Sequence, residues 1–338
     1  SRGLGDVYKR QHIFLCSFTD YYLSLSIMKY KNLIATVILL SQLVMAQGQA
    51  GSLFLSINPG ARANGMGEAQ IGIANDAYAT YYNPAGLSNL SSTQASFMHT
   101  SYLPNLVDDM AYDFITFATP FREDEAIGGH FTYLNLGDQI STDANGAELG
   151  SFSSYMYALN LSYSKKIDED SSWGVNGKYF YQELAVISSL DASSSSVAFD
   201  VGYFKHNAMD NPNLTMGAVL TNVGPGVSFG DGEEDPLPTK LGLGLGYLAL
   251  EGKANLAFDL NYEVNDQSMV TNLGVEYFLV EDFALRAGIM NDPSGDLSYT
   301  TLGLGARIDA LGFDVSYIMG GELDPHSNMV RFSLSGSF

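Results

Sequence analysis

The chain has 338 residues and is 46% hydrophobic, which is enough to bury a large core and excludes a disordered protein. Its formal charge is −21 with only 16 Lys and Arg residues, so the basic patch that nucleic-acid binding requires is excluded as well. The 35 glycine, 21 tyrosine and 19 phenylalanine residues favour a folded protein that is poor in helix.

The first element along the chain is a predicted leader. Met28 is the first methionine, and two lysines and an apolar run follow it, which is typical of a secretory signal peptide. We expect cleavage after Ala46 or, alternatively, after Ala50, so that 28–46 is the signal peptide. Residues 1–27 are expected to be non-native upstream sequence. They hold the one cysteine of the chain, so the exported protein is expected to have no disulfide and no lipid anchor.

Residues 51–91 follow the leader and lack the strand periodicity of the rest of the chain. Asn75 or Asp76 can cap a short helix through Tyr81, and Pro84 is expected to end that helix. We expect 51–91 to form a hatch, or plug, inside the lumen of the barrel that follows. It either packs there and seals the barrel or gates it.

From residue 92 onward, segments of about ten residues alternate with period two and are divided by Gly, Asn, Asp, Ser and Pro. In 254–262, for example, every second residue is apolar and the polar or small residues lie between. This pattern predicts an all-β, transmembrane outer-membrane β-barrel at 92–338, with one strand face toward lipid and the other toward a polar lumen. We expect about fourteen antiparallel strands, at 93–103, 109–119, 126–136, 153–165, 172–184, 196–206, 213–223, 238–248, 252–263, 269–279, 282–290, 298–308, 311–319 and 328–338.

The lengths of the predicted connections support this strand order. Long connections follow odd strands, at 137–152, 185–195 and 224–237, whereas most connections after even strands are short. This is the asymmetry of outer-membrane barrels, in which long loops are extracellular and short turns periplasmic. A secreted β-sandwich or solenoid is the alternative, but sandwich strands are shorter, about six residues. In 241–247 the lumen face is all glycine, as if something must fit closely against it.

Three arginines, Arg286, Arg307 and Arg331, have inward parity on their predicted strands. An unpaired charge facing lipid would cost about 2–4 kcal/mol at the membrane midplane, so we expect all three in the lumen, paired with carboxylates or hatch carbonyls. Phe338 ends a strand whose outward residues are apolar. This arrangement resembles the C-terminal signal that the barrel assembly machinery reads.

Catalytic chemistry finds little support in the sequence. The histidines after the leader are scattered, at 99, 130, 206 and 326, without metal-ligand spacing, and no serine stands out as their partner. The acidic segments 143–148 and 231–235 resemble calcium loops only loosely, and solvated loop charge is the better interpretation. We predict no enzyme, no cofactor and no bound metal.

Three short segments within 51–91, at 61–69, 74–77 and 82–87, carry a family resemblance. In this order they resemble the N-terminal signature of the PorV/PorQ family, which is itself similar to the FadL outer-membrane transporters. The run at 83–87, Asn-Pro-Ala-Gly-Leu, is closer to PorV and FadL usage than to the Pro-Ser form of PorQ. The hatch residues that the resemblance singles out are Arg62, Gly65, Met66, Gly67, Asp76, Asn83, Pro84, Ala85, Gly86 and Leu87.

The resemblance implies a FadL-like barrel with a small N-terminal hatch and a non-enzymatic part in type IX secretion. In that role the barrel binds the C-terminal signal domain of secreted cargo and carries it from the translocon to the surface attachment machinery. The implied partners are outer-membrane lipid, secreted cargo proteins and other type IX secretion components. Two alternatives remain open, a FadL-type channel for hydrophobic small molecules and a surface barrel with a structural or adhesive role. A channel predicts a continuous apolar pocket from the extracellular loops to the hatch, whereas a shuttle predicts a wide lumen or an exposed loop groove.

Overall fold

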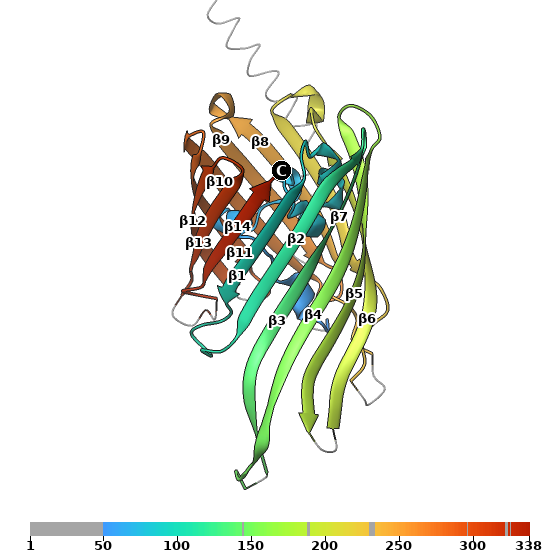
Figure 1. The fold of residues 1–338 in the computed structure, drawn as a ribbon, viewed down its shortest axis with the longest axis vertical. Helices are drawn as coiled ribbons and strands as arrows, with labels where there is room; N and C mark the ends of the chain where they lie inside the picture. Colours follow the sequence, from blue (N-terminus) through green and yellow to red (C-terminus); the bar gives the residue numbers. More distant parts are fainter. Residues whose placement is uncertain are drawn as a thin grey trace, which may run out of the picture. The chain divides into compact units, whose positions relative to one another are not determined.

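Antiparallel strands follow one another in chain order around a closed barrel, because β1 pairs with β14 as well as with β2 (Figure 1). The structure is a computed structural model that describes residues 50–143, 145–187, 190–229, 234–295, 297–321, 324 and 326–338. Within these residues the strands are β1 Gln94–Ser101, β2 Ala111–Arg122, β3 Glu125–Thr142, β4 Glu148–Lys166, β5 Ser171–Ile187, β6 Leu190–Lys205, β7 Leu214–Val223, β8 Lys240–Ala249, β9 Ala254–Glu263, β10 Ser268–Val280, β11 Phe283–Asp292, β12 Leu297–Ile308, β13 Leu311–Met319 and β14 Val330–Ser337. The predicted all-β barrel of about fourteen strands is confirmed.

Helical turns are short and most of them precede the first strand. They are η1 Leu53–Ser56, α2 Ala61–Gly65, η2 Ile71–Ile73, α3 Ala79–Tyr82, η3 Pro84–Asn89, η4 Ala208–Asp210 and η5 Leu250–Gly252. None of the helices in the described part of the chain is long and apolar enough to span a membrane. The predicted signal peptide, 28–46, and residues 1–27 lie outside the described residues.

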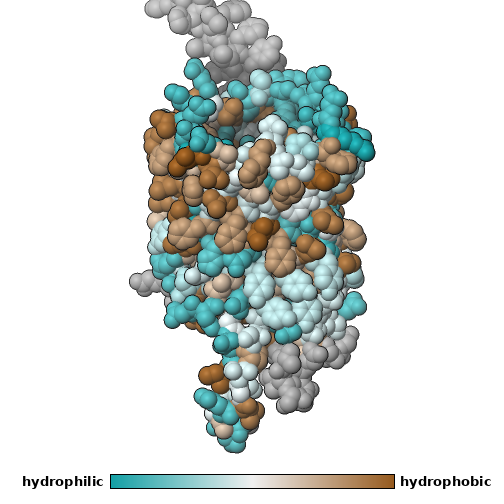
Figure 2. Space-filling model, in the orientation of Figure 1, coloured by the Kyte–Doolittle hydropathy of each residue, from teal (hydrophilic) through white to brown (hydrophobic). Residues whose placement is uncertain are grey.

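The wall alternates as the period-two pattern predicts. In β8 the side chains of Leu241, Leu243 and Leu245 are 45%, 51% and 39% exposed, whereas Gly242 and Gly244 between them are buried. Figure 2 shows the result as a band of hydrophobic side chains across the visible side of the wall, with hydrophilic side chains toward the ends. The outward face therefore suits lipid, and the inward face is left for polar side chains.

Two hairpins are longer than their sequences indicate. The ladder of β3 and β4 continues to the pair Thr142 and Glu148, and β5 and β6 also pair to their tips (Figure 1). The predicted loops 137–152 and 185–195 are therefore mostly strand, and that prediction was wrong. Ser, Gly and Asp are frequent in these two segments because the hairpins extend past the apolar band, where backbone pairing no longer needs an apolar face.

The two ends of the barrel differ in their connections. Tight connections at 123–124, 281–282 and 309–310 share the end at which β14 finishes, which we call the turn end. Longer connections at 102–110 and 224–239 lie at the opposite end, which we call the loop end.

Candidate functional site

The N-terminal segment, residues 52–90, lies inside the barrel and contacts the wall around its circumference. α2 packs against β11 to β14, η2 against β7 to β9, and η3 against β2 to β6 (Figure 1, blue). From Pro59 to Ser88 every residue is buried except Asn75 and Asp76. The inward side chains of the wall and this segment therefore form one interface, which is the candidate functional site.

Backbone meets backbone where η2 crosses β8. A Cβ atom at Gly72 would lie 2.5 Å from the carbonyl carbon of Leu245, and one at Gly246 would lie 2.7 Å from the Gly72 oxygen. Gly67, at φ +63°, has the same constraint, because its Cβ would lie 2.5 Å from the nitrogen of Ile289. No side chain fits at these positions, which accounts for the glycine face of β8.

Glu276 of β10 is the centre of a buried group of ion pairs. Arg62 of α2 donates to it from Nε at 3.0 Å and from Nη2 at 2.9 Å. Arg286 of β11 donates to the same carboxylate from Nε at 2.8 Å. Arg62 also pairs with Asp76, with its Nη1 atom 2.8 Å from Oδ2. Arg286 pairs with Asp314, with its Nη1 atom 2.7 Å from Oδ1. These five residues, the Glu276 cluster, join the N-terminal segment to three wall strands.

Asn83 joins the segment to the opposite part of the wall. Its fully buried side chain donates from Nδ2 to the carbonyl oxygen of Tyr203 in β6, at 3.1 Å, and to that of Ile71, at 3.3 Å. Its Oδ1 accepts the N–H of Ala85 at 3.2 Å and so caps η3. Pro84 opens η3 rather than only ending the preceding helix, since the first helical position needs no N–H.

The other residues of the predicted motif are also held at this interface. Asp76 accepts the N–H of Tyr78 at 2.9 Å, at the start of α3, in addition to its ion pair. Gly67 accepts a hydrogen bond from Asn272 of β10 at 2.7 Å through its carbonyl oxygen. The remaining motif residues are buried and contribute packing, namely Gly65, Met66, Ala85, Gly86 and Leu87.

Two wall carboxylates were missed by the sequence prediction. Asp259 of β9 accepts the N–H groups of Gln70 and Ile71, at 2.7 and 2.8 Å, and thereby holds η2. Asp200 of β6 pairs with Lys178 of β5 at 2.8 Å and accepts from Asn176, whose amide also donates to the carbonyl oxygen of Thr80 in α3. Both could have been found from the sequence, because each is a charge at inward parity within an apolar strand and so needs a partner.

The three predicted lumen arginines have different surroundings. Arg286 and Arg331 are buried and inward, and Arg331 donates to the carbonyl oxygen of Asn58 in the N-terminal segment. Arg307 keeps inward parity but is exposed at the turn end. There it lines a cavity of about 510 Å³ between the segment and the wall, together with Asp309 and Asp314. The cavity lining is mostly polar and charged.

Metal ligation has no geometric support among the residues that the structure describes, where no three His, Cys, Asp or Glu side chains come together. Asp143 instead closes its own turn by accepting the N–H groups of Ala147, at 2.9 Å, and Asn145, at 2.8 Å. These backbone donors hold the pKa of the Asp143 carboxyl below its ordinary value. The second acidic segment, 231–235, lies mostly outside the described residues.

Phe338 follows β14 with its ring exposed, and its N–H donates to the carbonyl oxygen of Thr93 at 2.9 Å, next to β1. We expect deletion of Phe338 to reduce the amount of assembled barrel severalfold, because the terminal aromatic and this closing contact are both lost. The heat-modifiable band in outer-membrane fractions measures assembly. Phe338→Tyr, which keeps the ring and the chain length, is the control. A normal band in the deletion variant would refute the expectation.

Comparison with known proteins gives one family and several similar folds. The sequence model of type IX secretion system protein PorV matches residues 47–271. No curated protein matches the chain.

Among solved structures, the chain is similar to the P. putida toluene transporter TodX, with a TM-score of 0.60, 12% identity and coverage of 83% of this chain and 99% of that one. The Ralstonia pickettii toluene transporter TbuX gives a TM-score of 0.58, 13% identity and coverage of 83% and 98%. A Pseudomonas aeruginosa FadL homologue gives a TM-score of 0.53 and 13% identity, with coverage of 82% of this chain and 97% of that one. At such identities the likeness shows the fold, which is the FadL-like barrel that was predicted. The match over 47–271 shows the family, and the chain belongs to the PorV family of type IX secretion system proteins.

Proposed function

We propose that this chain is an outer-membrane barrel that binds the C-terminal signal domains of secreted cargo at its loop end and passes them to the surface attachment machinery. Family membership supports a place in type IX secretion. In this proposal the N-terminal segment is the hatch of the barrel at 92–338, the turn end is periplasmic, and export uses the signal peptide at 28–46.

The observation that carries this proposal is the packing of the lumen. One apolar cluster runs from the loop 224–239, through Val227 and Leu237, to Tyr81 and Tyr82 of the segment. Its members come from both the wall and the segment, with Phe54 against Phe180 at a ring distance of 6.1 Å. A packed lumen favours cargo binding on the outside of the loop end over passage through the barrel.

The two long hairpins offer the surface for that binding. We call residues 136–154 and 184–198 the projecting hairpins, because β3 has no β2 partner beyond Asn135 and β6 has no β7 partner before Phe199. Ile140 and Leu149 on the first hairpin are 63% and 64% exposed, outside the apolar band of the wall. Exposed apolar side chains beside open strand edges suit the addition of a partner strand.

We expect the double variant Ile140→Asn, Leu149→Asn to lower cargo on the cell surface severalfold while the barrel still assembles, because only exposed apolar contacts are removed. Immunolabelling of a type IX cargo on intact cells gives the measurement. Leu106→Asn is the matched control, since Leu106 is 66% exposed in another loop-end connection. Normal display in the double variant would remove the hairpins from the proposal. Normal display of every cargo in a strain without the protein would reject the shuttle role itself.

A channel for hydrophobic small molecules is the second candidate. The fold likeness to toluene transporters and the cavity of about 510 Å³ beside the segment favour it. The charged lining of that cavity, which includes Asp76, Arg307 and Asp309, suits polar solutes better than hydrocarbons. Solute uptake and cargo display therefore distinguish the two candidates.

A further inference from the structure

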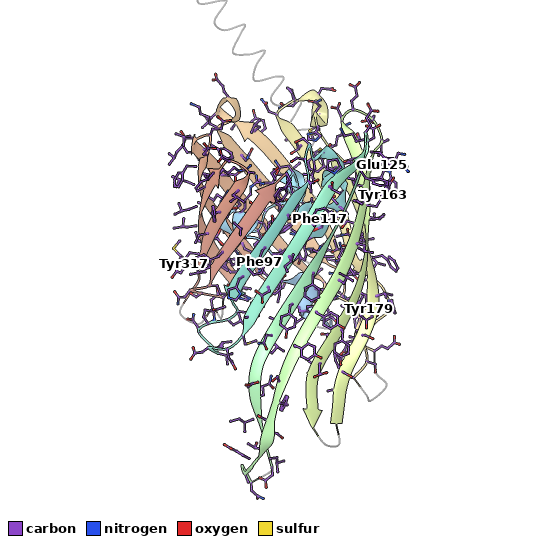
Figure 3. All side chains as sticks on the ribbon, viewed as in Figure 1. Phe97, Phe117, Glu125, Tyr163, Tyr179 and Tyr317 are labelled. Carbon is purple, nitrogen blue, oxygen red and sulfur yellow. The ribbon has the colours of Figure 1, made fainter. Side chains whose placement is uncertain are left out.

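A row of charged and aromatic side chains crosses the outer wall near the turn end. Strand register makes Glu125 of β3, Lys165 of β4, Trp173 of β5 and Tyr203 of β6 successive partners, and Arg122 of β2 is the other partner of Glu125. Partners in an antiparallel sheet share a face, and Trp173 and Tyr203 are 37% and 39% exposed. Figure 3 shows Glu125 and Tyr163 of β4 close to each other at the turn-end margin of this wall.

Lys205 extends the row by one step toward the turns. It lies two residues after Tyr203 on β6 and therefore on the same face. Its Nζ is 3.4 Å from the Ser171 hydroxyl oxygen, which the Tyr203 hydroxyl also approaches at 3.3 Å. We call Arg122, Glu125, Lys165, Trp173, Tyr203 and Lys205 the outer row.

The outer row is positively charged within an acidic protein. Glu125 is its one carboxylate and is shared between Lys165, at 3.0 Å, and Arg122, at 3.4 Å, which leaves positive charge unbalanced. In the adjoining turn, Asp168 accepts the N–H groups of Asp170 and Ser171 and lies close enough to Lys205 to offset part of its charge. The three cations of the row therefore face two carboxylates, Glu125 and Asp168, and the row keeps a net positive charge.

No other strand in the described ranges directs a Lys or Arg side chain outward. Lys178, Arg286 and Arg331 are buried in the lumen, Lys166, Lys240 and Arg307 have inward parity, and Lys253 lies in a turn. The gathering of all outward strand cations around Trp173, the one tryptophan of the chain, distinguishes this sector from the rest of the wall.

We propose that the outer row binds the phosphate of an anionic phospholipid in the leaflet that meets the turn end. Lys165 and Lys205 stand on strands that are about 10 Å apart, which a headgroup and its glycerol can bridge. Their ammonium groups and the Arg122 guanidinium donate to the phosphate oxygens, and their alkyl stems lie along the apolar wall. Trp173 and Tyr203 sit at the headgroup level, where amphipathic rings are favoured. This site depends on placement in the outer membrane and is independent of cargo binding.

Native mass spectrometry of the whole exported chain in an uncharged detergent tests the proposal with two probe lipids, phosphatidylglycerol and phosphatidylcholine. We expect preferential retention of phosphatidylglycerol and at least a tenfold weaker affinity in Lys165→Gln, Lys205→Gln, because each cation at a membrane surface contributes several-fold. Lys253→Gln, which removes a turn cation, should bind as the unchanged protein does. The charge-conserving variant Lys165→Arg, Lys205→Arg should keep the binding and shows that the site tolerates substitution.

Four results would overturn the proposal. Equal affinity for the two lipids would reduce the outer row to an aromatic girdle. Unchanged phosphatidylglycerol binding in the Gln double variant, or an equal loss in Lys253→Gln, would show that these two lysines do not form the site. Displacement of the lipid by millimolar inorganic phosphate would indicate an anion site rather than a lipid site. The heat-modifiable band confirms that each variant is folded before binding is measured.

Discussion

Glu276→Ala is expected to destabilise the barrel by about 3 kcal/mol or more and to loosen the N-terminal segment from the wall. Removing one partner of a buried ion pair typically costs about 3–5 kcal/mol, because the remaining charge stays buried without compensation. Here the change affects both Arg62 and Arg286, whose side chains are 10% and 5% exposed. Each arginine keeps one other carboxylate, so the cost should lie near the lower end of the range.

The temperature at which the folded band converts to the unfolded band on a gel measures this loss. Glu281→Ala is the control, because Glu281 is an exposed carboxylate in the turn that follows the same strand. Adding Arg62→Leu to Glu276→Ala should recover part of the loss, since it removes one of the two undercompensated charges. A conversion temperature in Glu276→Ala equal to that of the control would show that the Glu276 cluster does not hold the segment.

The strand pattern was predictable because lipid and lumen impose opposite requirements on alternate residues. Each predicted strand overlaps one observed strand, and the glycine face of β8 indicated a close neighbour, which is η2. The projecting hairpins were missed for the same reason. Outside the apolar band no such requirement acts, so the Ser-rich start of β6 resembles a loop although its backbone pairs with β5.

The interface between segment and wall was predictable only on the segment side. Arg62 and Asn83 stand within recognisable motifs, but their partners Glu276 and Tyr203 are 214 and 120 residues away along the chain. Tyr203 contributes a carbonyl oxygen, which any residue would supply, so its side chain carries no signal. The Glu276 side chain does carry a sequence signal, because a carboxylate at inward parity in an otherwise apolar strand requires a buried cation.

Replacing both Asn83 and Pro84 with alanine is expected to loosen the segment while the barrel stays closed. The change removes the cap of η3 and leaves the carbonyl oxygens of Ile71 and Tyr203 without the Asn83 amide. Each lost buried hydrogen bond costs about 1 kcal/mol, and alanine lacks the fixed backbone angle that Pro84 brings to the first turn of η3. The strand ladder does not use either side chain, so the folded band should persist.

The functional outcome of this double variant distinguishes the shuttle from the channel. If the barrel carries cargo, a loosened segment should reduce the surface display of type IX cargo and leave the uptake of an apolar solute such as toluene unchanged. A channel should instead leak or lose that uptake while display stays normal. Asn89→Ala is the matched control, because Asn89 lies in the same short helix and its amide nitrogen has no hydrogen-bond partner among the described residues. We expect loss of display, since apolar side chains of the described residues already pack the lumen from Val227 and Leu237 to α3. Altered toluene uptake with full display would reverse this choice and make the channel the function of the barrel.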